Sequence, residues 1–169
     1  LMAGVKLDNE FNEIVPIIID KDATNGDMMR TKELIDMYMY VFEKFANKNE
    51  EGFFNTRISL LDGKLCMQLK DDCKAFSEHI KLNVETEKNA AFIKAIFSED
   101  ALNMKTTEGF RGIPSIGSVV LNQFEGHDMF NKFAVQFQDG DRIFVISSIF
   151  GGTGASGFPL LLRTLRVPN

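Results

Sequence analysis

The sequence predicts an α/β fold in which a mostly parallel sheet is flanked by helices. Short runs of β-branched and aromatic residues, Ile17–Ile19 and Arg142–Ser148, are typical of parallel strands buried on both faces. Stretches with apolar residues at helical spacing lie between these runs, and strands that alternate with helices form layered parallel sheets. The chain has 169 residues, of which 44% are hydrophobic and 25% charged, which fits one globular domain.

The N-terminal part is predicted to contain a helix end, one strand and one long helix. Leu1–Val5 has the pattern of a helix end, and Pro16 stands at the entrance of the strand Ile17–Ile19. The loop Asp20–Asp27 follows, with Asp27 as the expected N-cap of the next helix. The inward face of that helix is expected to carry Leu34, Tyr38, Val41, Phe42 and Phe45.

The middle of the chain predicts a hairpin, two helices and a loop. Asp62-Gly63 lies between two apolar-rich runs, which is a hairpin signal. Helices are expected at Lys74–Ile80 and Glu87–Phe97, and the polar stretch Asn103–Gly112 is expected to be a loop. The second helix is predicted to pack through Phe92, Ile93, Ile96 and Phe97.

The C-terminal part predicts three helices around the second strand. Pro114 is expected in the first turn of a helix, and Phe124–Gln138 has helical spacing up to the break at Asp139-Gly140-Asp141. The strand Arg142–Ser148 follows, then a glycine-rich turn, Phe150–Gly157, and a last helix, Pro159–Arg166.

Charge and cysteine content narrow the function. Nineteen basic and 24 acidic residues give a net charge of −5, which argues against nucleic acid or an anionic membrane as the main partner. The sequence contains no apolar run long enough to cross a membrane and no visible signal peptide, so a cytoplasmic location is expected. Cys66 and Cys73 are expected to be reduced thiols, and His79 and His127 structural or surface residues.

The glycine loop is the strongest functional signal. Gly151-Gly152-Thr153-Gly154-Ala155-Ser156-Gly157 joins a predicted strand to a predicted helix. Glycines let the backbone approach a phosphate closely, and a helix N-terminus offers amides without intrahelical acceptors at a positive dipole end. A side chain placed at Gly152 is therefore expected to block a phosphate without disturbing the fold.

Three loops together resemble the tubulin superfamily. Phe144–Gly154 followed by Pro159 is similar to the signature of tubulins and of the bacterial division tubulin homologue, an apolar strand followed by GGGTG. Asp20-Lys21-Asp22-Ala23 resembles the N-T-D-A loop, and Gly109–Gly117 resembles the glycine-rich loop that ends in N-P-x-V-G. Bacterial tubulin-like proteins pair F-G-G-T-G-A with a G-F-x-G-x-P-x-I-G loop, which is the nearest resemblance.

This resemblance implies a Rossmann-like layered fold that binds GTP or GDP, in a self-assembling GTPase. The implied nucleotide-binding residues are Asp20, Asp22, Gly109, Gly112, Gly151, Gly152, Thr153 and Gly154. Residues 1–169 would form one incomplete nucleotide-binding domain of a longer protein, with residues 24–108 as an α/β insertion between the Asp20 loop and the Gly109 loop. The chain alone is expected to bind nucleotide weakly and not to hydrolyse it.

The sequence departs from the family signature at three positions. Phe150 replaces the first glycine of GGGTG, Ala155 replaces a Ser or Thr, and Asp20 replaces the Asn of N-T-D-A. The extra carboxylate calls for a cation such as Mg²⁺ beside a phosphate. Two alternatives stay open. One is an NAD(P)-binding fragment, since GGTGASG also resembles the loop of atypical short-chain reductases, and the other is an assembly module that has lost its nucleotide.

Overall fold

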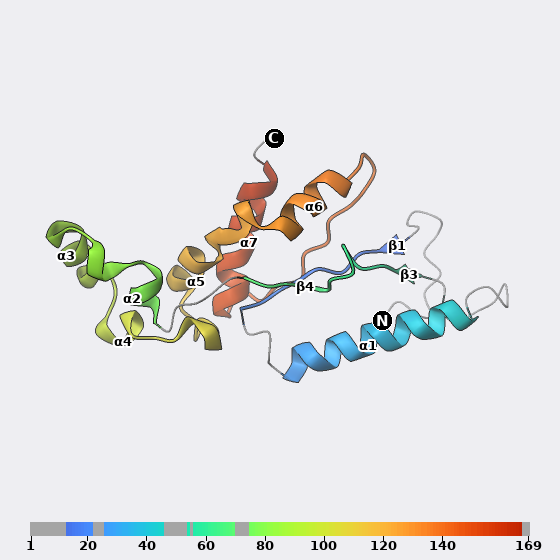
Figure 1. The fold of residues 1–169 in the computed structure, drawn as a ribbon, viewed down its shortest axis with the longest axis horizontal. Helices are drawn as coiled ribbons and strands as arrows, with labels where there is room; N and C mark the ends of the chain where they lie inside the picture. Colours follow the sequence, from blue (N-terminus) through green and yellow to red (C-terminus); the bar gives the residue numbers. More distant parts are fainter. Residues whose placement is uncertain (1–12, 22–25, 46–53, 55, 70–74, 167–169) are drawn as a thin grey trace. The chain divides into compact units, whose positions relative to one another are not determined.

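The computed structural model of the chain describes residues 13–21, 26–45, 54, 56–69 and 75–166. These residues form helices and two short parallel strand pairs, which confirms the predicted mixture of helices and parallel strands (Figure 1). The chain divides into two compact units, residues 1–19 with 23–67, and residues 20–22 with 68–169. The predicted insertion of residues 24–108 includes parts of both units and stays a prediction. The predicted helix end at Leu1–Val5 lies outside the described residues.

The first unit is built on parallel strand pairs. Strand β1 (Glu13–Ile14) pairs with β3 (Arg57–Ile58), and β2 (Ile18–Ile19) pairs with β4 (Cys66–Met67). The predicted strand at Ile17–Ile19 and its parallel pairing are therefore confirmed. Both residues of β2 are half-buried, so the expectation that this strand is covered on both faces is wrong for the described part of the chain.

A tight turn lies between β3 and β4. Leu61 and Lys64 form an antiparallel bridge, and both residues between them have positive φ, 53° at Asp62 and 68° at Gly63. Two left-handed central residues define a type I′ turn, as Asp-Gly predicts. The predicted hairpin is therefore confirmed at the turn and its Leu61–Lys64 bridge only, because the flanking strands β3 and β4 pair with β1 and β2 and not with each other.

Helix α1 (Gly26–Phe45) confirms the long helix and lies along the paired strands of its unit (Figure 1). Asp27 occupies its first turn and is not its N-cap. The Tyr38 hydroxyl donates a hydrogen bond to the Thr56 carbonyl oxygen over 2.7 Å, and the Tyr38 ring meets Phe54 edge-on at 5.5 Å between centroids. Leu34 and Phe45 are exposed, so part of the predicted inward face is wrong.

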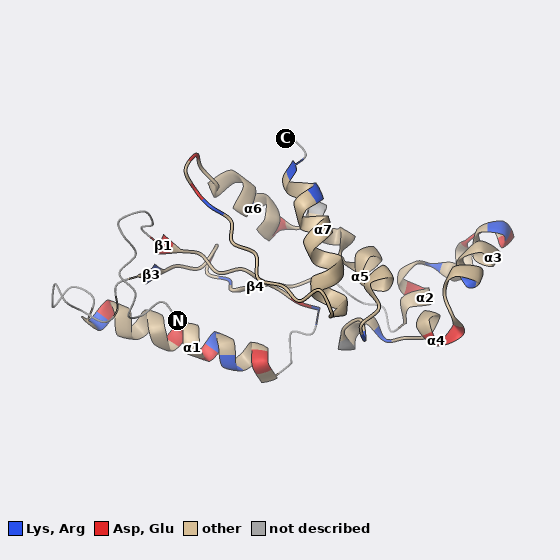
Figure 2. Cartoon of the chain, turned by 180° about the vertical axis from the view of Figure 1, so that it is seen from behind, with Lys and Arg blue, Asp and Glu red and all other residues tan. Residues whose placement is uncertain are grey.

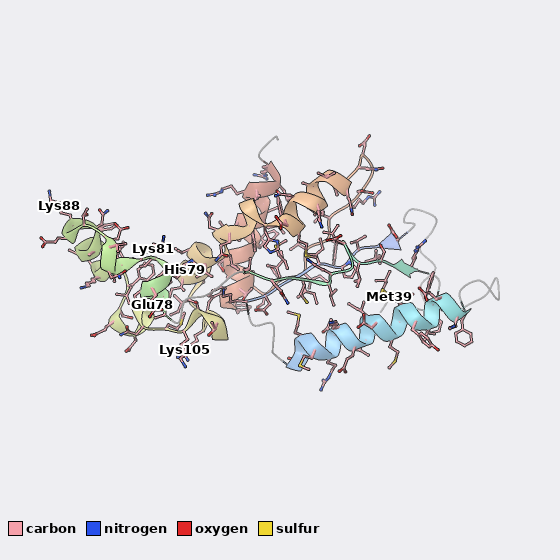
Figure 3. The ribbon with its side chains drawn as sticks, in the orientation of Figure 1. Met39, Glu78, His79, Lys81, Lys88 and Lys105 are labelled. Carbon is pink, nitrogen blue, oxygen red and sulfur yellow. The ribbon has the colours of Figure 1, made fainter. Side chains whose placement is uncertain are left out.

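The packing face of α1 keeps Tyr38, Val41 and Phe42 of the predicted face, which are half-buried, and includes Met28 in addition. Met28 is buried, and the Cys66 thiol lies 3.3 Å from the Met28 sulfur, which joins the start of α1 to β4. Met39 points from α1 toward the strands of the unit (Figure 3).

The second unit is mainly helical. Its elements, in chain order, are α2 (Phe76–His79), η1 (Leu82–Val84), α3 (Glu87–Ile96), α4 (Glu99–Leu102), η2 (Thr106–Glu108), α5 (Pro114–Leu121), η3 (Asn122–Gly126), α6 (Asp128–Gln136) and α7 (Gly152–Arg166). The predicted helices at 74–80, 87–97, from Pro114 and within 124–138 are thus confirmed in part, since α2 covers only Phe76–His79 and α6 begins at Asp128. Pro114 lies in the first turn of α5, as expected.

The core of this unit centres on α5. Ile116, Val120 and Leu121 are fully buried, and Phe124 of η3 and Phe110 of the preceding loop are nearly so. A second apolar cluster lies at the other end, where the Phe76 ring meets Phe97 at 5.1 Å between centroids. Helix α3 is more loosely held, because Phe92 and Ile96 are exposed; their predicted inward position is wrong.

The clearest predicted strand is also wrong. Residues 142–148 belong to no strand, although they are β-branched and apolar. A strand needs a hydrogen-bonding neighbour, and within the described residues no strand pairs with this segment. Local β-propensity alone does not supply that neighbour.

Candidate functional site

The glycine loop forms the first turn of a long helix. Helix α7 begins at Gly152, so Gly152, Thr153 and Gly154 are already helical; the predicted turn to Gly157 and start at Pro159 are wrong. Helix geometry leaves the amides of a first turn without intrahelical acceptors, at the positive end of the dipole. Pro159 lies inside the helix, where it lacks the N–H that would bond to Ala155.

The Gly109–Gly112 loop makes a tight turn beside this helix start. Gly109, Arg111 and Gly112 have positive φ values of 89°, 45° and 76°. The Ile113 amide donates to the Phe110 carbonyl oxygen over 2.8 Å, which closes the turn, and the Phe110 side chain anchors it in the core. Glycine adopts positive φ without steric cost, which explains two of the three positions.

The two glycine loops touch. A Cβ atom at Gly152 would lie 2.6 Å from the Phe110 Cβ and 3.3 Å from the Gly112 backbone nitrogen. Only glycine fits at residue 152 without a shift, because the first distance is shorter than real Cβ contacts. The structure therefore brings together two loops that lie far apart in sequence. It also overturns the expectation that a side chain at Gly152 would leave the fold undisturbed.

The N-termini of helices α5 and α7 lie side by side, and the two helices run in the same direction. A Cβ at Gly117, in the first turn of α5, would lie 2.9 Å from the Gly152 carbonyl oxygen, and one at Gly157, a turn further along α7, would lie 3.3 Å from Leu121. Contacts that advance in the same direction along both helices show that they run parallel. Neither N-terminal half carries a charged side chain (Figure 2), so two positive dipole ends lie together without a carboxylate on either first turn.

The four residues Gly151–Gly154 of the glycine loop have different surroundings. A Cβ at Gly154 would collide with the Ser148 backbone, so packing requires that glycine. Thr153 is half-buried, and a Cβ at Gly151 would meet nothing within 4 Å. Gly151 is thus the position of this motif where a bound group has free space beside the backbone.

The Asp20 loop belongs to the same unit. Residues 20–22 group with residues 68–169, which contain both glycine loops, and Asp22 lies outside the described residues. Lys21 is only 9% exposed, and its burial was not predicted because its sequence neighbours are acidic. Over the described ranges, no group of three His, Cys, Asp or Glu side chains is arranged to hold a metal ion.

No known protein family, curated protein or solved structure matches this chain. The site therefore rests on its own geometry. No helix in the described part of the chain is long and apolar enough to cross a membrane.

Small residues at the helix crossing were also missed. The Ser156 hydroxyl donates to the Gly152 carbonyl oxygen and lies against Gly117, which lets the two helix starts approach closely. The sequence signal was present, since Gly152 and Ser156 are one helical turn apart, but it required α7 to begin at Gly152.

A hollow of about 540 Å³ lies elsewhere in the unit, lined by Ser77, Glu78, Leu82, Asn83 and Lys94. Figure 3 shows Glu78, His79, Lys81 and Lys88 at this end of the unit, on or beside α2 and α3. Most of the lining side chains are exposed and of mixed charge, and no predicted site residue lies there.

Proposed function

We propose that this chain is a nucleotide-binding domain of a bacterial tubulin-like protein and that it binds GTP or GDP through the phosphates. The observation that carries the proposal is the approach of the Gly112 amide to Gly152, which joins the two glycine loops at the paired starts of α5 and α7. The Rossmann-like layered arrangement and membership of the tubulin superfamily belong to the same proposal, on the strength of the three sequence motifs.

The chemistry follows from the groups at the two helix starts. The Gly152, Thr153 and Gly154 amides of α7, with the Ser115 and Ile116 amides of α5, would donate to phosphate oxygens. Each hydrogen bond to a charged acceptor contributes about 1.5–3 kcal/mol. The Thr153 hydroxyl supplies a further donor, and Asp20 and Asp22 would face the phosphates through Mg²⁺.

Hydrolysis is not proposed for this chain alone. In the tubulin superfamily, the acidic loop that completes the hydrolytic site comes from the neighbouring subunit. The residues of this chain would hold the phosphates. No side chain fills the space beside the Gly151 backbone, so that space is open to them. Self-assembly and GTPase activity are therefore proposals for the longer protein.

One alternative has an observation in its favour. Phe150 stands where the family has a glycine and is 90% exposed beside Gly151, which favours an assembly module that has lost its nucleotide. The NAD(P)-binding alternative has no observation in its favour. Both it and the tubulin-like proposal expect a strand before the glycine loop, and within the described residues that segment is not paired as a strand.

Calorimetric titration of the purified chain with GTP, GDP and NADPH, each with Mg²⁺, tests the proposal. We expect weak binding of GTP and GDP and none of NADPH. Thr153→Val removes the hydroxyl and keeps the shape, so binding should weaken about tenfold, and Thr153→Ser should restore it. Binding of NADPH but not GTP, or equal affinity of Thr153→Val and the unmodified chain, would refute the proposed site.

A further inference from the structure

The sequence contains two Asp-Gly steps, Asp62-Gly63 and Asp139-Gly140, and the structure holds them differently. All four residues are exposed. A glycine that follows aspartate has no Cβ beside its amide nitrogen, so no side chain of its own hinders that nitrogen from approaching the aspartate carboxyl group. Which of the two steps brings these groups together therefore depends on how each turn is fixed.

The Asp62-Gly63 turn is fixed through the glycine nitrogen itself. The Gly63 amide donates a hydrogen bond to the Leu60 carbonyl oxygen over 3.3 Å, and the Lys64 amide donates to the Leu61 carbonyl oxygen over 3.0 Å. Leu61 is buried, so its side chain anchors the turn in the first unit. The Gly63 nitrogen can approach the Asp62 carboxyl group only when these bonds break and Leu61 leaves its packed position.

The residues that hold the Asp139-Gly140 turn are exposed. The Asp141 amide donates to the Gln138 carbonyl oxygen over 3.1 Å, and the Gln138 amide donates to an Asp141 carboxylate oxygen over 2.9 Å. In the described part of the chain, the Gly140 amide donates no hydrogen bond and the Asp139 carboxylate accepts none. Exposed hydrogen bonds without buried neighbours open at a low cost in free energy, so this turn is the one that frees both groups.

We propose that Asp139 is a site of spontaneous covalent modification, at which its link to Gly140 isomerises to isoaspartate. The Gly140 nitrogen attacks the Asp139 Cγ atom, and the new C–N bond closes a cyclic imide. The Cγ–OH bond breaks, and the amide proton leaves with that hydroxyl group as water. Water then opens the imide. Cleavage of the Cγ–N bond restores aspartate, whereas cleavage of the bond between the nitrogen and the backbone carbonyl carbon gives isoaspartate.

Isoaspartate changes the turn that leads from α6 toward α7. The main chain then runs through Cβ and Cγ of residue 139, and the former backbone carbonyl group becomes a free carboxylate. The two hydrogen bonds between Gln138 and Asp141 span this residue, so they are lost when the main chain lengthens. The inference does not depend on nucleotide binding.

Storage of the intact chain in warm buffer at neutral pH, followed by tryptic mapping, tests the proposal. Trypsin releases Asp139 in residues 133–142 and Asp62 in residues 58–64, and an isoaspartyl peptide elutes apart from its parent at the same mass. We expect isoaspartate to accumulate in residues 133–142 at least about tenfold faster than in residues 58–64, because opening the other turn costs the burial of Leu61. Equal rates, or faster reaction at Asp62, would overturn the proposal.

A variant and an unfolded control check the residue and the role of the fold. Asp139→Glu keeps the charge but would need a larger ring, so the isomer should disappear from residues 133–142; an isomer that persists would arise at Asp141 and contradict the assignment. In concentrated urea the two peptides should isomerise at similar rates, because both turns are lost. A difference in urea as large as that in the folded chain would also overturn the proposal, since the turns would then not control the reaction.

Discussion

Gly117 of α5 packs directly on Gly152 of α7. A Cβ added at residue 117 would lie 2.9 Å from the Gly152 carbonyl oxygen and closer still to the Ser156 hydroxyl. This contact fixes the distance between two helix starts, and with it the place where the glycine loops meet. The packing of α5 on α7 and the proposed phosphate site therefore both depend on Gly117, Gly152 and Ser156.

Gly117→Ala is therefore expected to destabilise the protein. Overpacking of a tight core typically costs about 1–3 kcal/mol, although alanine favours helix formation by about 1 kcal/mol over glycine. We expect the packing cost to exceed the helical gain, which urea unfolding followed by circular dichroism would measure. Gly126→Ala, at an open position, is the control. Equal stability of the two variants would show that the α5–α7 contact is looser than described.

Ser156→Ala should partly rescue Gly117→Ala. The Ser156 hydroxyl is the atom nearest to a Cβ at residue 117, so its removal relieves the worst overlap. The Gly152 oxygen and the Ser156 Cβ remain at 2.9 Å, so the rescue should be incomplete. In a double-mutant cycle the two variants should be non-additive by about 0.5 kcal/mol or more. Additive effects would mean that these side chains do not meet.

Glycines 151 and 152 should respond differently to alanine. Gly152→Ala would press on Phe110 and should lower the midpoint of urea unfolding, whereas Gly151→Ala has open space and should not. Gly151→Val should likewise keep the fold but weaken GTP binding, because its side chain would occupy the space proposed for phosphate. Unfolding midpoints and GTP titrations of the three variants separate a packing role from a binding role.

The phenol of Tyr38 gives a pH dependence. Burial raises the pKa of Tyr38 above its ordinary value. The folded state therefore favours the protonated phenol, and this contribution to stability is present below about pH 10 and lost as the pH rises through the raised value. In Tyr40→Phe, Tyr38 is the single tyrosine, so the ultraviolet absorbance of phenolate reports it alone. We expect a higher titration midpoint in the folded chain than in urea; equal midpoints would contradict the burial.

His127 should act as a helix cap. Its Nδ1 accepts a hydrogen bond from the Met129 amide over 3.2 Å at the start of α6, and its Nε2 lies 2.9 Å from the Gln68 carbonyl oxygen. His127→Ala should cost about 0.5–2 kcal/mol, the usual effect of losing an N-cap, and His127→Asn should recover part of it. Thermal unfolding would measure both, and an unchanged His127→Ala would exclude the capping role.

Local signals predicted the elements that depend on neighbouring residues. The type I′ turn at Asp62-Gly63, the proline start of α5 and the strand at Ile18–Ile19 follow from the backbone preferences of those residues. The segment 142–148 was mispredicted because a strand depends on a partner that its own residues do not specify.

The candidate site was predictable only in part. The motifs predicted Gly112 and Gly152 as site residues, which stays a prediction. Their contact depends on the crossing of α5 and α7, which no local pattern contains. Lys21 was missed because a lysine between two aspartates reads as solvated surface, whereas it is buried. The predicted roles of Asp20 and Asp22 stay predictions.

Nuclear magnetic resonance of the chain labelled with ¹⁵N-glycine tests the central claim most directly. The 13 glycines report on both units at once. Addition of GTP with Mg²⁺ should shift the amide signals of Gly112, Gly151, Gly152 and Gly154 and leave those of Gly26 and Gly63 in the first unit unchanged. Unchanged signals at the paired starts of α5 and α7 at millimolar GTP, or shifts confined to Gly26 and Gly63, would contradict the proposed phosphate site.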